Sequence, residues 1–493
     1  MNSQLVLDTF NHFNSNKVSY CHFKSNAFIN RTIFGKNDID VLVDVKDHDL
    51  VLDIISSLGY IKTKLPKNKR NDYIFSYIAN CNSSGKLIHL HLHLKLITGG
   101  KFFKNYNLKY EQEMLSNAIY LDNIKVANPN DEIVLLLIRS ILKVDLIDFL
   151  RKNLKGKKSF FPKNINDEFN YLLSKVNKKD MLESIEWIGI NLSANQVIDY
   201  INKIKDHHFQ NKDLLTLKRV NNKYLKNKII NKIPLYSLTM NIKKYFSFAK
   251  KRLIKKSKTS EKTIDSYSGV SIAFWGMDGA GKSTVSNIIY SWISKELKVQ
   301  HFYGGSGDGK LNFTINLIKK IKQKISRTKK LKIGSHEQKK SKKIKFGFVH
   351  TVRSLLVAFD KRKKIKTAVR LQNDGVITLF DRFPQDIVRG INDGPKIKRN
   401  KYNSIFYNIE KNIYKKFNNN KPDVNIFLKV DCDTAISRKP DHDLSILIEK
   451  ADVLENIVNN YGKEFITIDA TLPLDEVLLQ VKNNLWKIFS SQK

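Results

Sequence analysis

The chain has 493 residues, and its 87 lysines and arginines against 47 aspartates and glutamates give it a formal charge of +40. Such a charge attracts polyanions (nucleotides, nucleic acids, phosphoglycans or anionic membranes) without choosing among them, unless it only reflects an Asn- and Lys-rich composition. Its 21 glycines and 9 prolines are too few for low-complexity disorder, and its 3 widely separated cysteines argue against a disulfide framework or a CxxC zinc site. The length predicts roughly three folded units.

Neither a membrane span nor a secretory signal is expected. The most apolar run, "IVLLLIRSILKV" from Ile133, contains Arg139 and Lys143 and is too short to cross a bilayer. The first residues lack a basic segment followed by an apolar one. These features predict a cytoplasmic protein without a transmembrane segment.

Residues 1–125 mix strands and helices. The runs "DIDVLVDV" from Asp38 and "KLIHLHLHLKLI" from Lys86 predict strands, and "HDLVLDIISSLGY" from His48 predicts an amphipathic helix that ends near Gly59. Asp38 and Asp40 are two apart on a strand, so both carboxylates point to one face, where they can share a divalent metal ion. This arrangement predicts an α+β domain with a metal site.

Together with Lys24-Ser25 upstream, the paired aspartates resemble the nucleotidyltransferase fold. That resemblance implies a third carboxylate from a later strand, and the matching position here is His89, with His91 and His93 on the same face. Three interpretations stay open: a His-containing metal site that suits Mn²⁺ or Zn²⁺ better than Mg²⁺, a domain that binds ligand without catalysis, or a polar strand with no site.

The remainder divides into three segments. Residues 126–249 have apolar positions three or four apart, which predicts a helical connector. Residues 250–269 are basic and Ser/Thr-rich without apolar periodicity, which predicts a linker. Over residues 270–493 strands alternate with helices, which predicts an α/β domain with a parallel sheet.

A phosphate-binding loop opens this last domain. The run Gly276 to Thr284, "GMDGAGKST", satisfies GxxxxGK[ST] between a β-prone run and an amphipathic helix. Backbone N–H groups of such a loop close around phosphate oxygens at the positive end of the helix. Lys282 would neutralise charge on the β- and γ-phosphates, and the Ser283 hydroxyl would complete the Mg²⁺ shell. The residues expected to bind ATP are Gly276, Gly279, Ala280, Gly281, Lys282, Ser283 and Thr284.

A second buried strand, Val376 to Phe380, ends in Asp381-Arg382. A carboxylate at the end of a strand beside the loop can hold the Mg²⁺ water shell, and the adjacent arginine can clamp a transferring phosphoryl group. We expect Asp381 and Arg382 to act on one metal-phosphate site with Lys282.

The order and spacing of "GMDGAGKST", "LFDRF", "KPDVNIFLKVDCDTAISRKPD" and "FITIDATLPLDEVLLQV" resemble thymidylate kinase and its relatives over residues 268–490. The resemblance implies a nucleoside-monophosphate-kinase fold and γ-phosphoryl transfer from ATP to a phosphate acceptor. It implies that Asp278 binds the acceptor sugar hydroxyl, that Arg382 with Phe383 binds the acceptor, and that Arg438 reaches the phosphates.

Two departures concern the acceptor. The family's Asp/Asn-Arg pair on the base-binding helix is replaced by Asp360-Lys361 and then Arg362, which we place at the acceptor. Lysine lacks the planar fork that bonds and stacks on a base. The forms "DRFPQ" and "YGGSGDG" resemble thymidylate kinase-like proteins found with surface-polysaccharide genes, so the acceptor is either a nucleoside monophosphate such as dTMP or a phosphosugar or glycan.

The insertion 319–345 holds 13 lysines and arginines and one glutamate. It predicts a solvated basic segment, which leaves an anionic glycan or nucleic acid as open partners. The run lacks the interleaved aromatic residues that stack on single-stranded bases. The sequence as a whole predicts an ATP- and Mg²⁺-dependent kinase acting on a small phosphorylated acceptor. A nucleic-acid-associated ATP switch, a second nucleotidyltransferase activity and a homodimer remain open alternatives.

Overall fold

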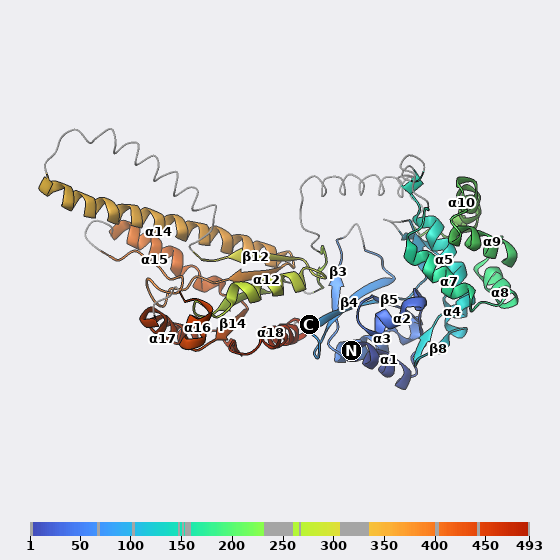
Figure 1. Cartoon of the computed structure of the whole chain (residues 1–493), viewed down its shortest axis with the longest axis horizontal. Helices are drawn as coiled ribbons and strands as arrows, with labels where there is room; N and C mark the ends of the chain where they lie inside the picture. The colour runs from blue at the N-terminus through green and yellow to red at the C-terminus, as the bar shows by residue number, and fades with distance from the viewer. Residues whose placement is uncertain are drawn as a thin grey trace. The chain divides into compact units, whose positions relative to one another are not determined.

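The computed structural model describes residues 3–66, 70–100, 104–145, 148–149, 152, 159–230, 260–265, 268–305, 335–399, 404–440 and 444–491. Within this range the chain forms two compact units, residues 1–258 and 259–493 (Figure 1). Most of the basic insertion and of the expected linker lie outside the described residues.

The N-terminal unit begins with a mixed α+β region. Its sheet has the strand order β3-β4-β5-β2-β1-β9-β8, in which β2 runs parallel to β5 and antiparallel to β1. The predicted strands at 38–45 and 86–97 and the predicted helix at 48–60 are confirmed as β2, β5 and α3. The elements are α1 (Gln4–Ser15), β1 (Tyr20–His22), α2 (Ile29–Ile33), β2 (Ile39–Val43), α3 (His48–Ser57), β3 (Ile61–Lys64), β4 (Ile74–Cys81), β5 (Lys86–His93), β6 (Ile97–Gly99), β7 (Lys104–Asn107), α4 (Glu111–Ser116), β8 (Ile119–Leu121) and β9 (Ile124–Val126).

Helices complete this unit, as the 3.6-residue periodicity predicts for the described part of the segment. The first helix begins with Pro129 at a position that needs no N–H donor, and the Asn128 side chain caps it by accepting from the Asn130 N–H. Its residues are buried almost all round because helices pack on several sides of it. The helices are α5 (Pro129–Lys143), α7 (Lys163–Leu173), α8 (Lys178–Ile188), α9 (Ala194–Lys205) and α10 (Asn211–Leu225).

Buried carboxylates join the first of these helices to its surroundings. Glu132 accepts from the backbone and side-chain N–H groups of Asn26, and Asp131 accepts from Tyr110 and Ser184. Burial raises the pKa of Glu132 to about 7. The described helices therefore pack against the α+β region and belong to the N-terminal unit.

The C-terminal unit is an α/β fold around a fully parallel sheet with the strand order β12-β13-β11-β14-β15. The central strands β11 and β13 are buried along their whole length, as expected for a parallel sheet covered on both faces. The elements are β10 (Thr263–Ile264), β11 (Ser271–Trp275), α12 (Lys282–Ile293), β12 (Val299–Tyr303), α14 (Ser335–Asn373), β13 (Ile377–Asp381), α15 (Ser404–Lys415), β14 (Val424–Lys429), α16 (Cys432–Arg438), α17 (Leu444–Asn460), β15 (Phe465–Asp469) and α18 (Leu474–Ser491).

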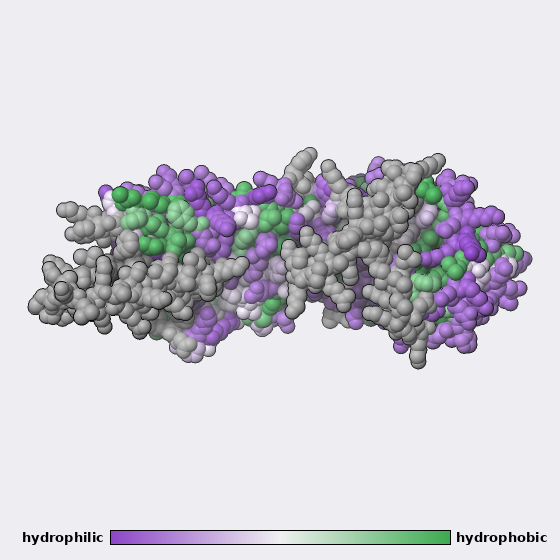
Figure 2. All heavy atoms as spheres, turned by 90° about the horizontal axis from the view of Figure 1, so that it is seen from above, coloured by the Kyte–Doolittle hydropathy of each residue, from purple (hydrophilic) through white to green (hydrophobic). Residues whose placement is uncertain are grey.

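On the face drawn in Figure 2, hydrophilic side chains cover most of the coloured surface, and apolar ones gather in separate patches. In the described parts of the chain, none of the helices combines the length and the apolar character that crossing a bilayer requires. Many apolar side chains are buried in the interiors of the two units, and others, such as Ile405 and Val45, are exposed.

Candidate active site

The phosphate loop connects β11 to α12 and depends on glycine. Gly276 and Gly279 have φ angles of +147° and +93°, in the region that L side chains rarely adopt. A Cβ at Gly279 would lie 2.5 Å from the Ala435 carbonyl oxygen of α16, and one at Gly276 would lie 2.7 Å from the Leu428 carbonyl oxygen of β14. The sequence motif therefore reflects both backbone conformation and close packing against the neighbouring strand and helix.

Helix α12 begins at Lys282, directly after Gly281, so its unpaired N–H groups point into the loop. The Lys282 side chain is buried, and its Nζ donates to the carbonyls of Gly276 and Met277 over 2.8 and 2.6 Å. Burial, together with the charge of Arg382, lowers the pKa of Lys282 to about 8. A cation is thus fixed inside a cradle of N–H donors, where it can act on an anion.

Ser283, in the first turn of α12, meets Asp381 at the carboxyl end of β13. Strand β13 runs parallel to β11 with Asp381 opposite Phe274, which brings Asp381 beside the loop that follows β11. Ser283 Oγ donates to Asp381 Oδ2 over 2.6 Å. Asp381 Oδ1 is buried and has no hydrogen-bond partner among the described residues. A hydroxyl and a carboxylate with a spare buried oxygen are hard donors that fit Mg²⁺.

Arg382 is held toward the loop by an unusual backbone. Its φ of +74° is left-handed, a conformation that costs a non-glycine residue free energy and that clusters at functional sites. Its guanidinium donates to Asp278 Oδ1 over 3.0 Å and lies 3.8 Å from Asp393 Oδ2. The arginine expected to bind phosphate therefore stands beside the aspartate expected to bind the acceptor hydroxyl.

Asp278 has a second cationic partner, Lys450 of α17, whose Nζ lies 2.6 Å from Asp278 Oδ2. Partial burial alone would raise the pKa of Asp278, but Lys450, Lys282 and Arg382 outweigh it and hold that pKa well below its usual range. Asp278 is therefore an ionised acceptor of hydrogen bonds at neutral pH, which suits contact with a hydroxyl.

Lys361 has a role that differs from the expected one. Its side chain is 1% exposed, and its Nζ donates to the backbone oxygen of Asp393 over 2.9 Å and lies 3.3 Å from Asp393 Oδ1. Tyr414 OH is 3.4 Å away. Because its Nζ already makes these contacts, Lys361 is not available to hydrogen-bond to the base of an acceptor. The contacts fasten the loop after β13 to α14.

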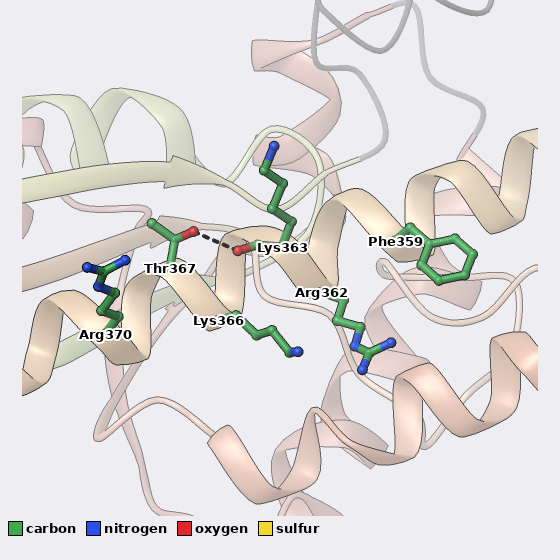
Figure 3. A pocket seen from close by; sticks show the side chains of 6 residues that line it. All are labelled: Phe359, Arg362, Lys363, Lys366, Thr367 and Arg370. Carbon is green, nitrogen blue, oxygen red and sulfur yellow. Dashed lines mark hydrogen bonds between the residues drawn. The ribbon is translucent and has the colours of Figure 1, made fainter.

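Arg362, also placed at the acceptor by sequence, lies elsewhere on α14. It lines a surface hollow of about 510 Å³. Figure 3 shows the lining side chains projecting from this helix: Phe359, Arg362, Lys363, Lys366, Thr367 and Arg370. None of the phosphate-loop residues lines this hollow.

Two further expected site residues are engaged within the protein. Phe383 is 2% exposed, and its ring packs between Phe380 and Trp275, so it serves the core. The Arg438 guanidinium donates a hydrogen bond to the backbone carbonyl of Ala470 over 2.8 Å. The buried position of Phe383 does not support direct contact with a substrate. The Arg438 side chain points to the end of β15, where Ala470 lies.

Sequence reasoning missed Lys450 and Asp393. Neither belongs to a motif, since Lys450 is one of many lysines and Asp393 lies in an irregular loop. The available signal was the sequence "NDGP" after Arg382, in which Asp393 has a φ of +61°. That loop is held by Gln385, which bonds to the backbones of Val388 and Ile391.

The N-terminal histidines and aspartates do gather on one face. In the register of β2 and β5, Asp40 lies opposite His91. Both aspartates lie at this face but differ in their nearest partners: Asp38 Oδ1 lies 3.2 Å from His89 Nδ1, whereas Asp40 Oδ1 lies 2.6 Å from Lys24 Nζ and 3.4 Å from His91 Nδ1. A shared metal ion at the two aspartates stays a prediction. Although burial opposes it, the Lys24 charge and the bonds from His91 and His93 hold the pKa of Asp40 well below its usual range.

Comparison with known protein families finds no match. The chain is 29% identical over 218 residues to the uncharacterized ATP-binding protein YghR of Escherichia coli K12, covering 43% of this chain and 84% of that protein. It is 27% identical over 212 residues to the uncharacterized ATP-binding protein YghS of the same strain, covering 42% and 88%.

A solved structure of deoxyadenosine kinase from M. mycoides aligns with 44% of this chain and 98% of that one, at 19% identity and a TM-score of 0.26. A likeness at this level does not transfer that enzyme's activity. The functional interpretation rests on the site itself.

Proposed function

We propose that the C-terminal unit is an ATP-dependent phosphotransferase that moves the γ-phosphoryl group of ATP to a small, phosphate-bearing acceptor. The observation that carries this proposal is the meeting of Ser283 with Asp381, 98 positions later, over 2.6 Å. It joins a complete phosphate loop to a carboxylate and an arginine at the carboxyl edge of one parallel sheet. Ligands bind at that edge in open α/β sheets. The names of the two relatives, both ATP-binding proteins, agree with it.

In this proposal the phosphate loop binds the nucleotide. Backbone N–H groups from Gly276 to Thr284 surround the β- and γ-phosphates, and the start of α12 adds its partial positive charge. Lys282 releases its bonds to the carbonyls of Gly276 and Met277 and neutralises charge on the transferring group. The close packing of Gly279 on α16 keeps the loop in shape, so little reorganisation is needed.

Ser283 and Asp381 would hold Mg²⁺, directly or through water. The ion supplies neutralisation of the charge that develops on the phosphate oxygens. Asp381 Oδ1 is buried and has no hydrogen-bond partner among the described residues, so this oxygen is available to bind Mg²⁺.

The acceptor would lie against Arg382 and Asp278. The Arg382 fork can hold the acceptor phosphate, and Asp278 can accept from an acceptor hydroxyl. An oxygen of the acceptor phosphate attacks the γ-phosphorus, the bond from that phosphorus to the β–γ bridging oxygen breaks, and ADP leaves. The side chains position and stabilise charge, which is most of what such a transfer needs.

The placement of Lys361 favours a phosphosugar over a nucleoside monophosphate as the acceptor. The position aligned with the base-reading arginine of thymidylate kinases is buried and bonded to Asp393 and Tyr414. A buried group already satisfied within the protein cannot also supply hydrogen bonds to a base. The same phosphate-binding machinery then serves an acceptor recognised through its hydroxyls and phosphate.

The test is a transfer screen with γ-labelled ATP and purified full-length protein against nucleoside monophosphates, including dTMP, and hexose phosphates. We expect labelled product with at least one phosphorylated acceptor, lost in Lys282→Ala and retained in Lys295→Ala, an exposed lysine of the same unit. Transfer that survives Lys282→Ala would remove this loop from the reaction. Transfer to dTMP at about 1 to 100 per second would overturn the phosphosugar preference.

A further inference from the structure

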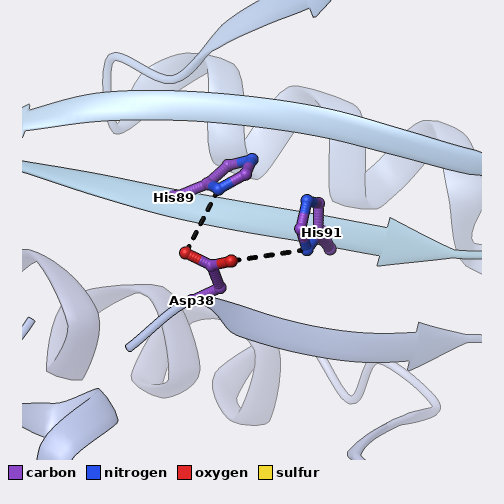
Figure 4. A group of neighbouring side chains, drawn as sticks. All are labelled: Asp38, His89 and His91. Carbon is purple, nitrogen blue, oxygen red and sulfur yellow. Dashed lines mark ion pairs between the residues drawn. The ribbon is translucent and has the colours of Figure 1, made fainter. Parts of the chain in front are cut away.

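A second cluster of chemically active side chains belongs to the N-terminal unit and shares no residue with the kinase proposal. It consists of Asp38, His89 and His91, whose ligand atoms all lie within 4.8 Å of one another. Figure 4 shows both imidazoles turned toward the Asp38 carboxylate from the neighbouring strand. His89 Nδ1 lies 3.2 Å from Asp38 Oδ1, and His91 Nδ1 lies 4.0 Å from Asp38 Oδ2.

The register of β2 and β5 and the alternation of side chains along β5 bring these three residues together. Strands β2 and β5 are parallel with Asp40 opposite His91, so Asp38, one step before β2, comes level with His89. Side chains two apart on a strand share a face, which brings His89 and His91 to the same side as Asp38. Their ring centroids are 4.1 Å apart. The two imidazoles and the carboxylate therefore converge without any loop having to close over them.

We propose that Asp38, His89 and His91 bind one divalent transition-metal ion of the Zn²⁺ or Mn²⁺ class. A tetrahedral ion with bonds of about 2.1 Å places its ligand atoms about 3.4 Å apart. The distances of 3.2 Å from His89 Nδ1 to Asp38 Oδ1 and 4.0 Å from His91 Nδ1 to Asp38 Oδ2 lie on either side of that value. Two nitrogen donors and one oxygen donor suit zinc or a similar ion and disfavour Mg²⁺, which prefers oxygen ligands throughout.

The surroundings of His89 fit a metal ligand. Its Nε2 lies 2.7 Å from Ser76 Oγ, which also accepts from Thr63 Oγ1 over 2.8 Å. A histidine that binds metal through Nδ1 donates its Nε2–H to such an outer partner, which fixes the ring. His89 is buried, whereas the side chains of Asp38 and His91 are 51% and 28% exposed. The buried His89 would hold the ion from the protein interior, and the exposed sides of Asp38 and His91 would leave the ion accessible to solvent.

Asp40 is the neighbour that separates this site from the paired-aspartate site expected from sequence. Its Oδ1 lies 2.6 Å from Lys24 Nζ, 3.3 Å from His93 Nε2 and 3.4 Å from His91 Nδ1, so it borders the cluster while already paired with an ammonium group. An ammonium group at that distance competes with a metal ion for the same oxygen. Three protein ligands, without Asp40, leave coordination positions for water or for an oxygen atom of a bound substrate.

The experiment uses tag-free, full-length protein freed of metals with a chelator and titrated calorimetrically with Zn²⁺, Mn²⁺ or Mg²⁺ in the absence of nucleotide. We expect one equivalent of Zn²⁺ or Mn²⁺ to bind at least tenfold more tightly than Mg²⁺. Asp38→Asn and His91→Asn should each weaken that binding at least tenfold. Both positions are partly exposed, so these variants should fold, which circular dichroism checks.

The matched controls are Asp49→Asn and His12→Asn, which remove an exposed carboxylate and an exposed imidazole of the same unit and should leave binding unchanged. Asp40→Asn should keep most of the affinity. If Asp40→Asn abolishes binding while His91→Asn does not, the paired aspartates are the site and the proposal is wrong. It is equally wrong if the wild-type protein takes up no metal, or if Asp38→Asn binds it as tightly as wild type.

Discussion

Lys450 Nζ lies 2.6 Å from Asp278 Oδ2 and thereby joins helix α17 to the phosphate loop across 172 positions of sequence. Asp278 also accepts from Arg382, so one carboxylate coordinates two cations from different elements. In the proposed reaction, this network would hold the side chains that contact the acceptor in a fixed position relative to the phosphate loop.

Replacing Lys450 by alanine should therefore weaken acceptor use more than ATP binding. A charge-assisted hydrogen bond contributes about 1.5 to 3 kcal/mol, which corresponds to roughly a 10- to 100-fold loss in kcat/KM for the acceptor. Steady-state kinetics with acceptor and ATP varied separately measures this. Lys463→Ala, an exposed lysine three residues beyond α17, is the control. An equal loss for ATP and acceptor would count against the separation.

The pair Ser283 and Asp381 gives the second prediction. Ser283→Ala and Asp381→Asn should each reduce phosphoryl transfer at least tenfold and raise the Mg²⁺ concentration needed for half-maximal rate, because both supply hard oxygen donors. Ser291→Ala, at an exposed position on the same helix, should change neither quantity. A Mg²⁺ requirement that is the same in wild type and both variants would contradict the assignment of the metal to this pair.

The lowered pKa of Lys282 predicts that the stability of the C-terminal unit depends on pH. The folded pKa of this lysine, about 8, lies below the unfolded value of about 10.5, so the unfolded chain binds more protons between these pH values. The stability of the unit therefore rises with pH across this window, and the penalty is full below pH 8. We expect the wild type to gain about 2 kcal/mol between pH 7 and 10 relative to Lys282→Met. Denaturant unfolding of both proteins measures the difference, and parallel pH curves would refute it.

Lys361 and Asp393 form a buried pair whose removal should loosen the loop after β13. Loss of one buried partner costs about 3 to 5 kcal/mol, so Lys361→Met should destabilise the unit by that order, and adding Asp393→Asn should restore part of the loss. Hydrogen exchange over residues 383–397 should increase in Lys361→Met. It should stay at the wild-type level in Lys366→Met, an exposed lysine of the same helix. Additive effects of the two mutations would mean that the pair is not coupled.

The sequence was informative where a local pattern fixes local geometry. The phosphate loop, the strands on either side of it and the alternating histidines follow from short motifs and periodicity, and the structure contains them at those positions. The partners of Asp278 and Lys361 come from segments far away in sequence, so only the packing of α14 and α17 could reveal them. Lys24 illustrates the same limit, because nothing local indicates that its ammonium group reaches Asp40.

The left-handed backbone of Arg382 has a consequence for the evolution of this protein. Arg382→Gly and Arg382→Ala both remove the guanidinium, but only glycine relieves the strain at a φ of +74°. We expect the glycine variant to be about 1 kcal/mol more stable than the alanine variant in thermal unfolding, while both lose phosphoryl transfer. Comparable melting temperatures for the two variants would show that the backbone is relaxed. If Arg382 acts in the proposed phosphoryl transfer, selection for thermal stability alone would favour glycine at this position, and only selection for activity would retain the arginine.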